Sequence, residues 1–135
     1  MLPLVSAYWE FESLTGFDAE KVSSQLERLL SDSRLGAGWI AIEGEVPVGY
    51  LLAVYVFSLE HLGITAEIDE FFVVPDNRHS GTGSGLLLAA ETEFTELGCT
   101  NVSLQISREN DSARRFYLRH GYVGRSKYDL LDKDL

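Results

Sequence analysis

The sequence has few of the residues that mark several large classes of protein. It contains one cysteine, Cys99, and three prolines among 135 residues. A single cysteine cannot form an internal disulfide, which excludes a small fold held together by disulfides. The longest apolar runs fall far short of the roughly 18 residues of a membrane-spanning helix, and residues 1–4 lack the basic stretch of a secretory signal. These absences predict a cytoplasmic protein that does not associate with membranes.

Positive charge is also scarce. Eleven Lys and Arg residues stand against 21 Asp and Glu residues, which gives a net charge of −10. Such a field repels a phosphate backbone, so nucleic-acid binding is excluded and a cationic partner is favoured. The length and the apolar content of 45% predict one folded domain that spans residues 1–135.

The hydrophobic pattern alternates between helical and strand periods. After an aromatic-rich helix or coil over 1–17, Asp18 caps a helix that Gly36 and Gly38 end. Strands are then predicted over 39–42, 46–56, 66–74 and 102–106, with closing strands over 122–131. Helices are predicted from the glycine-rich turn at 78–85 to Gly98, on an inner face of Leu87, Ala90, Phe94 and Leu97, and from Asn110 to Gly121. This order predicts an α/β fold with an antiparallel first half and a parallel pair formed by the strands at 66–74 and 102–106.

The strand at 66–74 carries an unusual acidic segment. Glu67, Asp69 and Glu70 occupy three of four successive positions, although carboxylates are poor strand formers. In a regular strand Glu67 and Asp69 share one face and Glu70 points to the other. A bulge would change that relation, so the sequence leaves open which carboxylates lie together.

The glycine-rich turn is a candidate anion site. Gly81, Gly83 and Gly85 follow a strand and open a helix, where unpaired N–H groups and the helix dipole attract a phosphate. The turn lacks the lysine of a Walker A loop, and its G-x-G-x-G spacing differs from the dinucleotide fingerprint. A flexible loop without a ligand is the alternative.

Two motifs together resemble those of the GCN5-related N-acetyltransferase (GNAT) family. The first, Val73-x-Pro75-x-x-Arg78-x-x-Gly81-x-Gly83, is similar to the family's acetyl-CoA motif. The second comprises Asn110, Ala113, Tyr117, Gly121 and Tyr122 in the family's register. The resemblance covers residues 38–131 and departs from the family at His79, where glycine is common, and at Gly85, where alanine is usual. The family's first strand is not evident in residues 1–17.

The resemblance implies a mixed central sheet with a splayed parallel pair and helices on both faces. It also implies acetyl-CoA as cosubstrate, with no metal. The pantetheine arm would pair with the backbone of Phe72, Val73 and Val74, and Asn110 would meet it or order the end of the strand at 102–106. The diphosphate would lie beside Arg78 against the backbone of His79, Ser80, Gly81, Thr82, Gly83 and Ser84.

The implied reaction is direct acetyl transfer to a primary amine of a small cationic molecule or a peptide. An alkylammonium must lose a proton before it attacks, and a carboxylate can accept that proton. Glu70 and, next, Glu67 are the candidate bases, and Tyr117 is the candidate donor to the leaving thiolate. Tyr8, Trp9 and Tyr55 are candidates for the wall of the acceptor site, with core packing as the alternative. A non-catalytic acyl-CoA sensor on the same scaffold and a transferase for longer acyl groups remain open, as does a homodimer.

Overall fold

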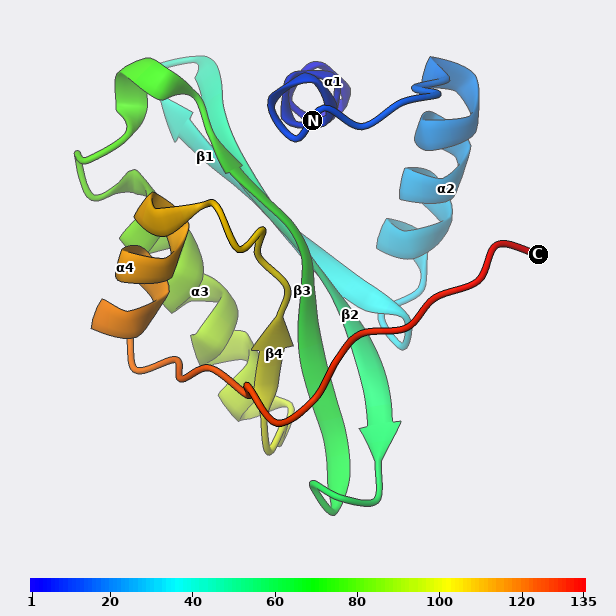
Figure 1. Cartoon of the computed structure of the whole chain (residues 1–135). Helices are drawn as coiled ribbons and strands as arrows, with labels where there is room; N and C mark the ends of the chain where they lie inside the picture. Colours follow the sequence, from blue (N-terminus) through cyan, green and yellow to red (C-terminus); the bar gives the residue numbers. More distant parts are fainter. The chain divides into compact units, whose positions relative to one another are not determined.

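The computed structural model describes all residues from 1 to 135, and the chain divides into two compact units, residues 1–104 and 105–135. The first unit holds most of the regular structure (Figure 1). Its elements are α1 (Leu2–Phe11), α2 (Ala19–Ser31), β1 (Gly36–Glu43), β2 (Val46–Ser58), β3 (Gly63–Val73), the short 3-10 helix η1 (Pro75–Asn77), α3 (Thr82–Glu96) and β4 (Val102–Leu104). The second unit holds α4 (Asp111–Arg119). None of these helices is both long and apolar enough to cross a membrane.

The four strands form one sheet in the order β1-β2-β3-β4. The first three strands are antiparallel, and β4 runs parallel to β3 after the crossover through α3. The parallel pairing covers three residue pairs and ends where Ile68 meets Leu104, although β3 continues to Val73. The predicted mixed sheet is therefore confirmed, and the edge of β3 beyond Ile68 has no strand partner on the β4 side.

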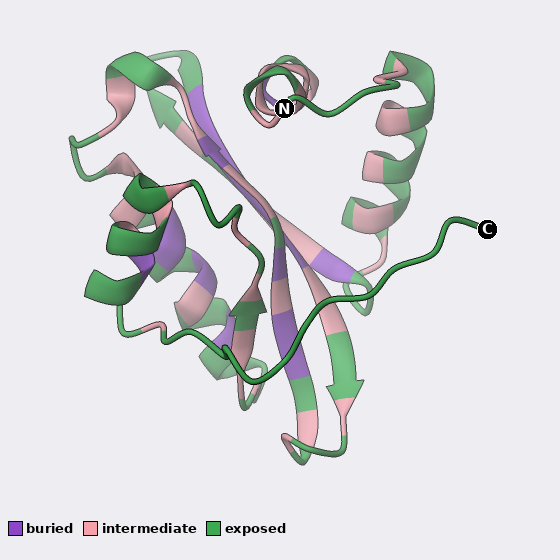
Figure 2. Ribbon diagram, viewed as in Figure 1, coloured by how far each residue is buried: buried purple, intermediate pink, exposed green.

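Helices α1 and α2 cover one face of this sheet. The core on this face contains Leu4 and Val5 of α1, Tyr50 and Leu52 of β2, and Phe72 of β3. Val22, Leu26 and Leu29 of α2 pack against it. The Asp18 side chain caps α2 as predicted, by accepting bonds from the N–H groups of Glu20 and Lys21. Burial is concentrated along the sheet and on the inner sides of the helices (Figure 2).

Helix α3 packs on the first three strands from the other face. Its buried residues are Leu86, Leu87, Ala90 and Phe94. The Phe94 ring meets Trp39 and Tyr55 edge to face, with centroid distances of 5.5 and 6.3 Å. Leu97 was expected on this inner face, but it follows the last helical turn and is 54% exposed.

The predicted end of the first long helix is wrong. Gly36 and Gly38 do not end the first long helix, which stops at Ser31, but lie in β1. At Gly38 a Cβ would come within 2.9 Å of Leu52 Cδ2 and 3.0 Å of Leu30 Cδ2, so this glycine permits close packing of α2 on the sheet.

The second unit consists of α4 and an extended tail. The Asn110 side chain caps α4 by accepting a bond from the Ala113 N–H (3.0 Å), and Gly121 turns the chain after α4 with a φ of 86°. Residues 122–131, predicted as closing strands, contain no strand. The segment from Gly124 to Lys127 lacks alternating apolar side chains, and a turn bond from the Tyr128 N–H to the Arg125 carbonyl interrupts it.

Candidate active site

A β-bulge lies at the acidic segment of β3. Leu52 on β2 pairs with Glu70, and the next residue, Ala53, pairs with Ile68, so that Asp69 is the extra residue on β3. Because paired residues share a face, Glu70 and Glu67, which pairs with Val54, both lie on the face of Leu52. The regular alternation considered from the sequence is therefore wrong, and the bulge brings Glu67 and Glu70 to the side covered by α1.

Glu70 is held by two hydrogen bonds from aromatic residues on different elements. The Tyr50 hydroxyl of β2 donates to Oε2 at 2.7 Å, and the Trp9 indole N–H of α1 donates to Oε1 at 3.3 Å. Tyr50 is fully buried, so its hydroxyl cannot turn to solvent for a partner. Both Glu70 oxygens are thus engaged, and the carboxylate links α1 to the sheet.

Burial raises the pKa of both carboxyl groups at the bulge. Desolvation raises the pKa of Glu70, the neighbouring Asp69 charge adds to this, and the bonds from Tyr50 and Trp9 oppose it. Partial desolvation raises the pKa of Asp69, although the side chain keeps its contact with solvent. The pKa of Tyr8 rises to about 12, first through burial and then through the charges of Glu12, Glu70 and Asp69.

Two aromatic side chains of α1, Tyr8 and Trp9, lie near the acidic segment. The Tyr8 ring lies 6.4 Å from Tyr50 and 6.3 Å from Phe72, and the Trp9 ring lies 5.5 Å from Phe17, all in edge-to-face geometry. The Trp9 indole reaches Glu70, so α1 supplies both aromatic surface and a polar contact to the acidic segment. Tyr55, the third predicted wall residue, packs on Phe94 of α3 instead.

The end of β3 leads into Arg78. The Arg78 Nε donates to the Val73 carbonyl at 2.7 Å, and its guanidinium lies over the rings of Phe11 and Phe72, at 4.7 and 5.4 Å from their centroids. The Val74 N–H is directed to β2, where it donates to the Val48 carbonyl. The structure therefore ties Arg78 to β3 and to α1.

The glycine-rich turn forms the entrance to α3. Gly81 is the N-cap with a φ of 89°, and His79 has a φ of 61°, so two residues adopt left-handed backbone. The N–H groups of Thr82 and Gly83 lie in the first helical turn, where no carbonyl within the helix can accept from them. A Cβ at Gly81 would meet no atom within 4 Å, and residues 79–85 carry no acidic side chain. The turn is therefore open and compatible with an anion.

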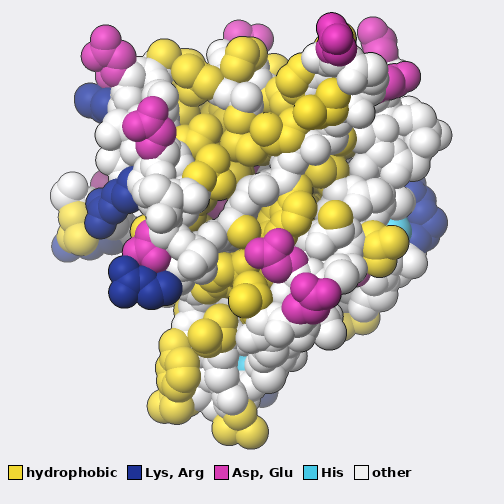
Figure 3. All heavy atoms as spheres, turned by 180° about the vertical axis from the view of Figure 1, so that it is seen from behind, with side chains coloured by type: hydrophobic (Ala, Val, Ile, Leu, Met, Phe, Trp, Pro, Cys, Tyr) yellow, Lys and Arg dark blue, Asp and Glu magenta, His cyan; other side chains and the backbone are white.

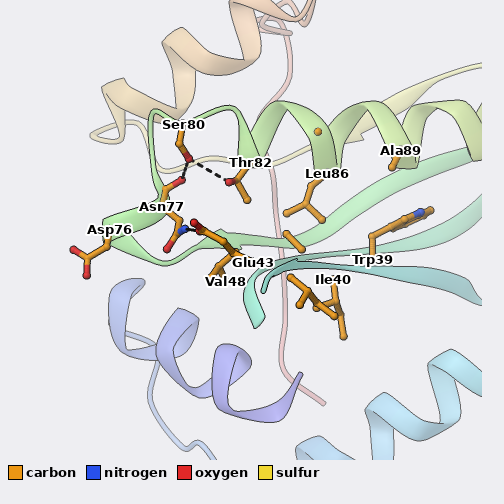
Figure 4. A pocket seen from close by; sticks show the side chains of 13 residues that line it. Trp39, Ile40, Glu43, Val48, Asp76, Asn77, Ser80, Thr82, Leu86 and Ala89 are labelled. Atoms are coloured by element: carbon orange, nitrogen blue, oxygen red, sulfur yellow. Dashed lines mark hydrogen bonds between the residues drawn. The ribbon is translucent and has the colours of Figure 1, made fainter. Parts of the chain in front are cut away.

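A cavity of about 610 Å³ lies beside this turn, between α3 and the first two strands (Figure 4). Trp39, Val48 and Leu86 give it an apolar wall, and Ser80 and Thr82 border it from the turn. The Ser80 hydroxyl donates to the Asn77 carbonyl at 2.6 Å and lies 3.2 Å from the Thr82 hydroxyl. The acidic segment of β3 does not line this cavity, which makes the two features separate.

Tyr117 and Asn110 belong to the second unit. The Tyr117 ring packs edge to face on Phe116 and Tyr122, at 5.2 and 5.4 Å, and Asn110 serves as the N-cap of α4. These contacts account for local order in the second unit, and the role of Tyr117 as a proton donor stays a prediction.

The structure brings some of the predicted site residues together. Glu70 and Phe72 lie with Trp9 and Tyr8 on the α1 side of β3, and Glu67 shares that face. Tyr50 was missed as the partner of Glu70, since its strand pattern is that of any core residue. Figure 3, which shows the face seen from behind, shows a band of hydrophobic side chains with Asp and Glu side chains above it and near its lower part, and with Lys and Arg side chains at the left.

Comparison with known proteins gives one family. The family model described as the acetyltransferase (GNAT) family matches residues 2–122. The aminoalkylphosphonate N-acetyltransferase of Salmonella typhimurium is 39% identical over 79 residues, which are 58% of this chain and 51% of that protein. The match thus spans about half the length of this curated relative.

Solved structures share the fold over nearly the whole chain. An integron cassette protein from the Cole Harbour Salt Marsh metagenome has a TM-score of 0.87 at 26% identity, and covers 99% of this chain and 82% of its own. A structure described as AAC(6')-Iy in complex with a bisubstrate analogue, CoA-S-monomethyl-acetylneamine, has a TM-score of 0.84 at 19% identity, with 99% and 89% coverage.

Proposed function

Because the chain belongs to the acetyltransferase (GNAT) family, we propose that it is an acetyl-CoA-dependent N-acetyltransferase that transfers the acetyl group directly to a primary amine. The proposal rests on two features that occur together: an open glycine turn at the N-terminus of α3, and an edge of β3 that has no partner strand beyond Ile68. The first feature suits a diphosphate, and the second suits an extended amide-containing arm. The proposed location is the cytoplasm.

Named residues would hold the cosubstrate. Of Phe72, Val73 and Val74, only Val73 would offer its N–H to the pantetheine arm. The Val74 N–H donates to Val48 on β2, and Phe72, two positions earlier on the same antiparallel strand, directs its N–H and carbonyl to β2 as well. The Val73 carbonyl accepts from Arg78 Nε. The N–H groups between His79 and Ser84 would bind the diphosphate. Because Arg78 Nε bonds to Val73, only its terminal Nη groups can reach a phosphate oxygen without breaking that bond. Asn110 retains its proposed place near the pantetheine.

The proposed chemistry moves two protons. The acceptor ammonium loses one proton to a carboxylate of the acidic segment, for which Glu70 and Glu67 are the candidates from the sequence. The neutral amine then attacks the thioester carbonyl, and the C–N bond forms as the C–S bond breaks. As the amide forms, the nitrogen loses a second proton and keeps the third. The leaving thiolate takes one proton, with Tyr117 as the proposed donor, and the proton lost by the nitrogen restores the balance.

We propose a small cationic amine as the acceptor. Glu67, Asp69 and Glu70 supply negative charge beside the aromatic surface of Tyr8 and Trp9, an arrangement that suits an ammonium group on an apolar frame. The net charge of −10 agrees with this choice. Aminoalkylphosphonates, the substrates named for the Salmonella relative, form the natural comparison because they add an anionic group to the amine.

Two measurements test the proposal. In a thermal-shift panel of acetyl-CoA, succinyl-CoA, NAD and ATP, acetyl-CoA at 100 times its Kd should add about 2.7 kcal/mol of stability. A free-thiol assay with spermidine, neamine, 2-aminoethylphosphonate and a lysine peptide should then show acceptor-dependent release. Stabilisation by ATP or NAD alone would contradict the proposal.

A variant of Tyr117 distinguishes an enzyme from a non-catalytic acyl-CoA sensor. Tyr117→Phe keeps the ring that packs on Phe116 and Tyr122 and removes the hydroxyl. For an enzyme we expect acetyl-CoA affinity to be kept and kcat to fall about 10²-fold or more, as for loss of a general acid. Binding of acetyl-CoA without thiol release by the wild-type protein would instead identify a sensor.

A further inference from the structure

The bulge gives the two neighbouring carboxylates of β3 different environments. Asp69 is the extra residue, so its side chain is not held in the pattern of cross-strand pairs that fixes Glu70 opposite Leu52. Asp69 is exposed, whereas Glu70 is half-buried. The two adjacent carboxylates therefore differ in environment, because Asp69 faces solvent and Glu70 faces the protein.

Asp69 and Glu70 also differ in their hydrogen bonds. Glu70 accepts from Tyr50 and Trp9, so both of its oxygens are occupied, and these bonds oppose the rise that desolvation gives to its pKa. The Asp69 side chain has neither a hydrogen bond nor an ion pair. Its oxygens are therefore available to an incoming ammonium group without the loss of an existing bond.

We infer that Asp69 is the carboxylate that accepts the proton of the acceptor amine and that Glu70 is a positioning residue. The inference rests on the proposed function and assigns the base within it. Desolvation raises the pKa of Asp69 and of Glu70 alike, which suits proton transfer at either residue, and the unoccupied oxygens of Asp69 are what separates the two.

Glu70 acts through the backbone it shares with Asp69. Its two bonds join β3 to Tyr50 on β2 and to Trp9 on α1, and they fix the chain at the position next to the bulge. The proton balance is simple: one ammonium proton passes to Asp69 Oδ and then to water, and the amine lone pair becomes free to form the C–N bond. The second N–H proton compensates the charge of the departing thiolate.

Amide variants in the full chain test the division. Asp69→Asn, Glu70→Gln and Glu67→Gln each remove one carboxylate at nearly constant shape, and Glu45→Gln in the exposed β1–β2 turn is the matched control. With acetyl-CoA and the best acceptor of the amine panel, we expect Asp69→Asn to lower kcat by about 10²- to 10⁴-fold. Glu70→Gln should raise the acceptor KM by about fivefold, the effect of one hydrogen bond, with kcat kept within about threefold.

Conservative variants of Tyr50 and Trp9, the two donors to Glu70, test whether Glu70 is a positioning residue. Tyr50→Phe and Trp9→Phe each remove one donor to Glu70 and keep an aromatic ring, so both should reproduce the KM effect of Glu70→Gln and not the kcat effect of Asp69→Asn. Thermal unfolding of each variant confirms that it is folded under the assay conditions. A purely structural role for Glu70 would change the melting temperature without this split between KM and kcat.

The outcomes are distinct from those of the proposed function. If the wild-type protein binds no acetyl-CoA or releases no thiol with any amine, the proposed function fails. If the wild type turns over and Asp69→Asn loses less kcat than Glu70→Gln or Glu67→Gln, the assignment of Asp69 is overturned while the proposed function stands. A kcat loss in Asp69→Asn that exceeds both others establishes the assignment.

Discussion

His79 carries the sharpest conflict between residue type and backbone. Its φ of 61° lies in the left-handed region, which costs a residue with a Cβ about 1–2 kcal/mol. Glycine removes this cost and loses part of the gain because its unfolded chain is more flexible. We therefore expect His79→Gly to stabilise the free protein by up to about 1 kcal/mol, measured by chemical denaturation.

A second substitution at the same turn gives the opposite sign. Gly81 has a φ of 89° and open space around its Cβ position, so Gly81→Ala adds backbone strain and no clash. It should destabilise the protein by about 1 kcal/mol. Equal effects from the two substitutions would show that the left-handed backbone is not what determines stability here.

Glu70 makes stability depend on pH. Its pKa in the folded protein is raised above its ordinary value of 4.5, chiefly by desolvation, so the folded state holds the proton more tightly than the unfolded state. The stability that Glu70 contributes is then largest below pH 4.5 and falls as the pH rises through the folded-state pKa. Glu70→Gln should remove this fall, so the stability of wild type minus variant should decrease with rising pH.

A variant of Tyr50, one of the donors to Glu70, provides a second test of this pH dependence. Tyr50→Phe removes the hydrogen bond that opposes the upward shift, so the pKa of Glu70 should rise further and the decline should extend to higher pH. Urea denaturation of the three proteins at a series of pH values above and below 4.5 gives the comparison. A wild-type difference that grows with pH would contradict the desolvation of Glu70.

At the scale of elements, one glycine within α3 lowers the stability of that helix. Gly85 lies inside the helix, and a Cβ there would meet no atom within 4 Å. Gly85→Ala should stabilise the protein by up to about 1 kcal/mol, which corresponds to roughly 3–5 °C in melting temperature for a chain of this size.

Gly49 provides the matched control on β2. A Cβ at this position would come within 2.9 Å of the Phe72 carbonyl oxygen and 3.2 Å of Leu86 Cδ1, between the sheet and α3. Gly49→Ala should therefore lower the melting temperature although the chemical change is the same. Stabilisation by both substitutions would indicate a looser fit of α3 on the sheet.

The elements that local chemistry specifies could be predicted from the sequence. Asp18 and Asn110 cap helices by side-chain bonds to nearby N–H groups, and these helices begin where expected. Gly36 and Gly38 were misread as helix ends because a glycine needed for close packing has the same sequence signature as one needed for a turn. The tail after Gly121 was misread because apolar residues alone do not make a strand.

The candidate site depends on a feature that the sequence could only raise as a possibility. Three carboxylates in a strand mark the segment, but the facing of Glu67, Asp69 and Glu70 depends on the bulge opposite Leu52 and Ala53. The donors to Glu70 come from α1 and β2, 61 and 20 residues away in sequence. Contacts of that kind follow from the tertiary arrangement and leave no local signal.

At the scale of the whole molecule, net charge bears on acceptor encounter. A chain with a charge of −10 and an acidic segment on β3 attracts cations over the Debye length, which is about 30 Å at 0.01 M salt and about 8 Å at 0.15 M. Such attraction raises the rate of encounter and leaves the chemical step unchanged. The charge of the acceptor should therefore change kcat/KM and leave kcat unchanged.

Ionic strength separates a cationic acceptor from an aminoalkylphosphonate. For spermidine, raising the salt from 0.01 to 0.15 M should lower kcat/KM on the order of tenfold, because screening removes the long-range attraction. For 2-aminoethylphosphonate, whose phosphonate opposes its ammonium, the same change should leave kcat/KM level or raise it. Initial rates of thiol release at saturating acetyl-CoA measure both, with kcat as the internal control. A preference for the phosphonate at low salt would mean that a local contact, with Arg78 as the nearest cation to Phe72, outweighs the field of the acidic chain.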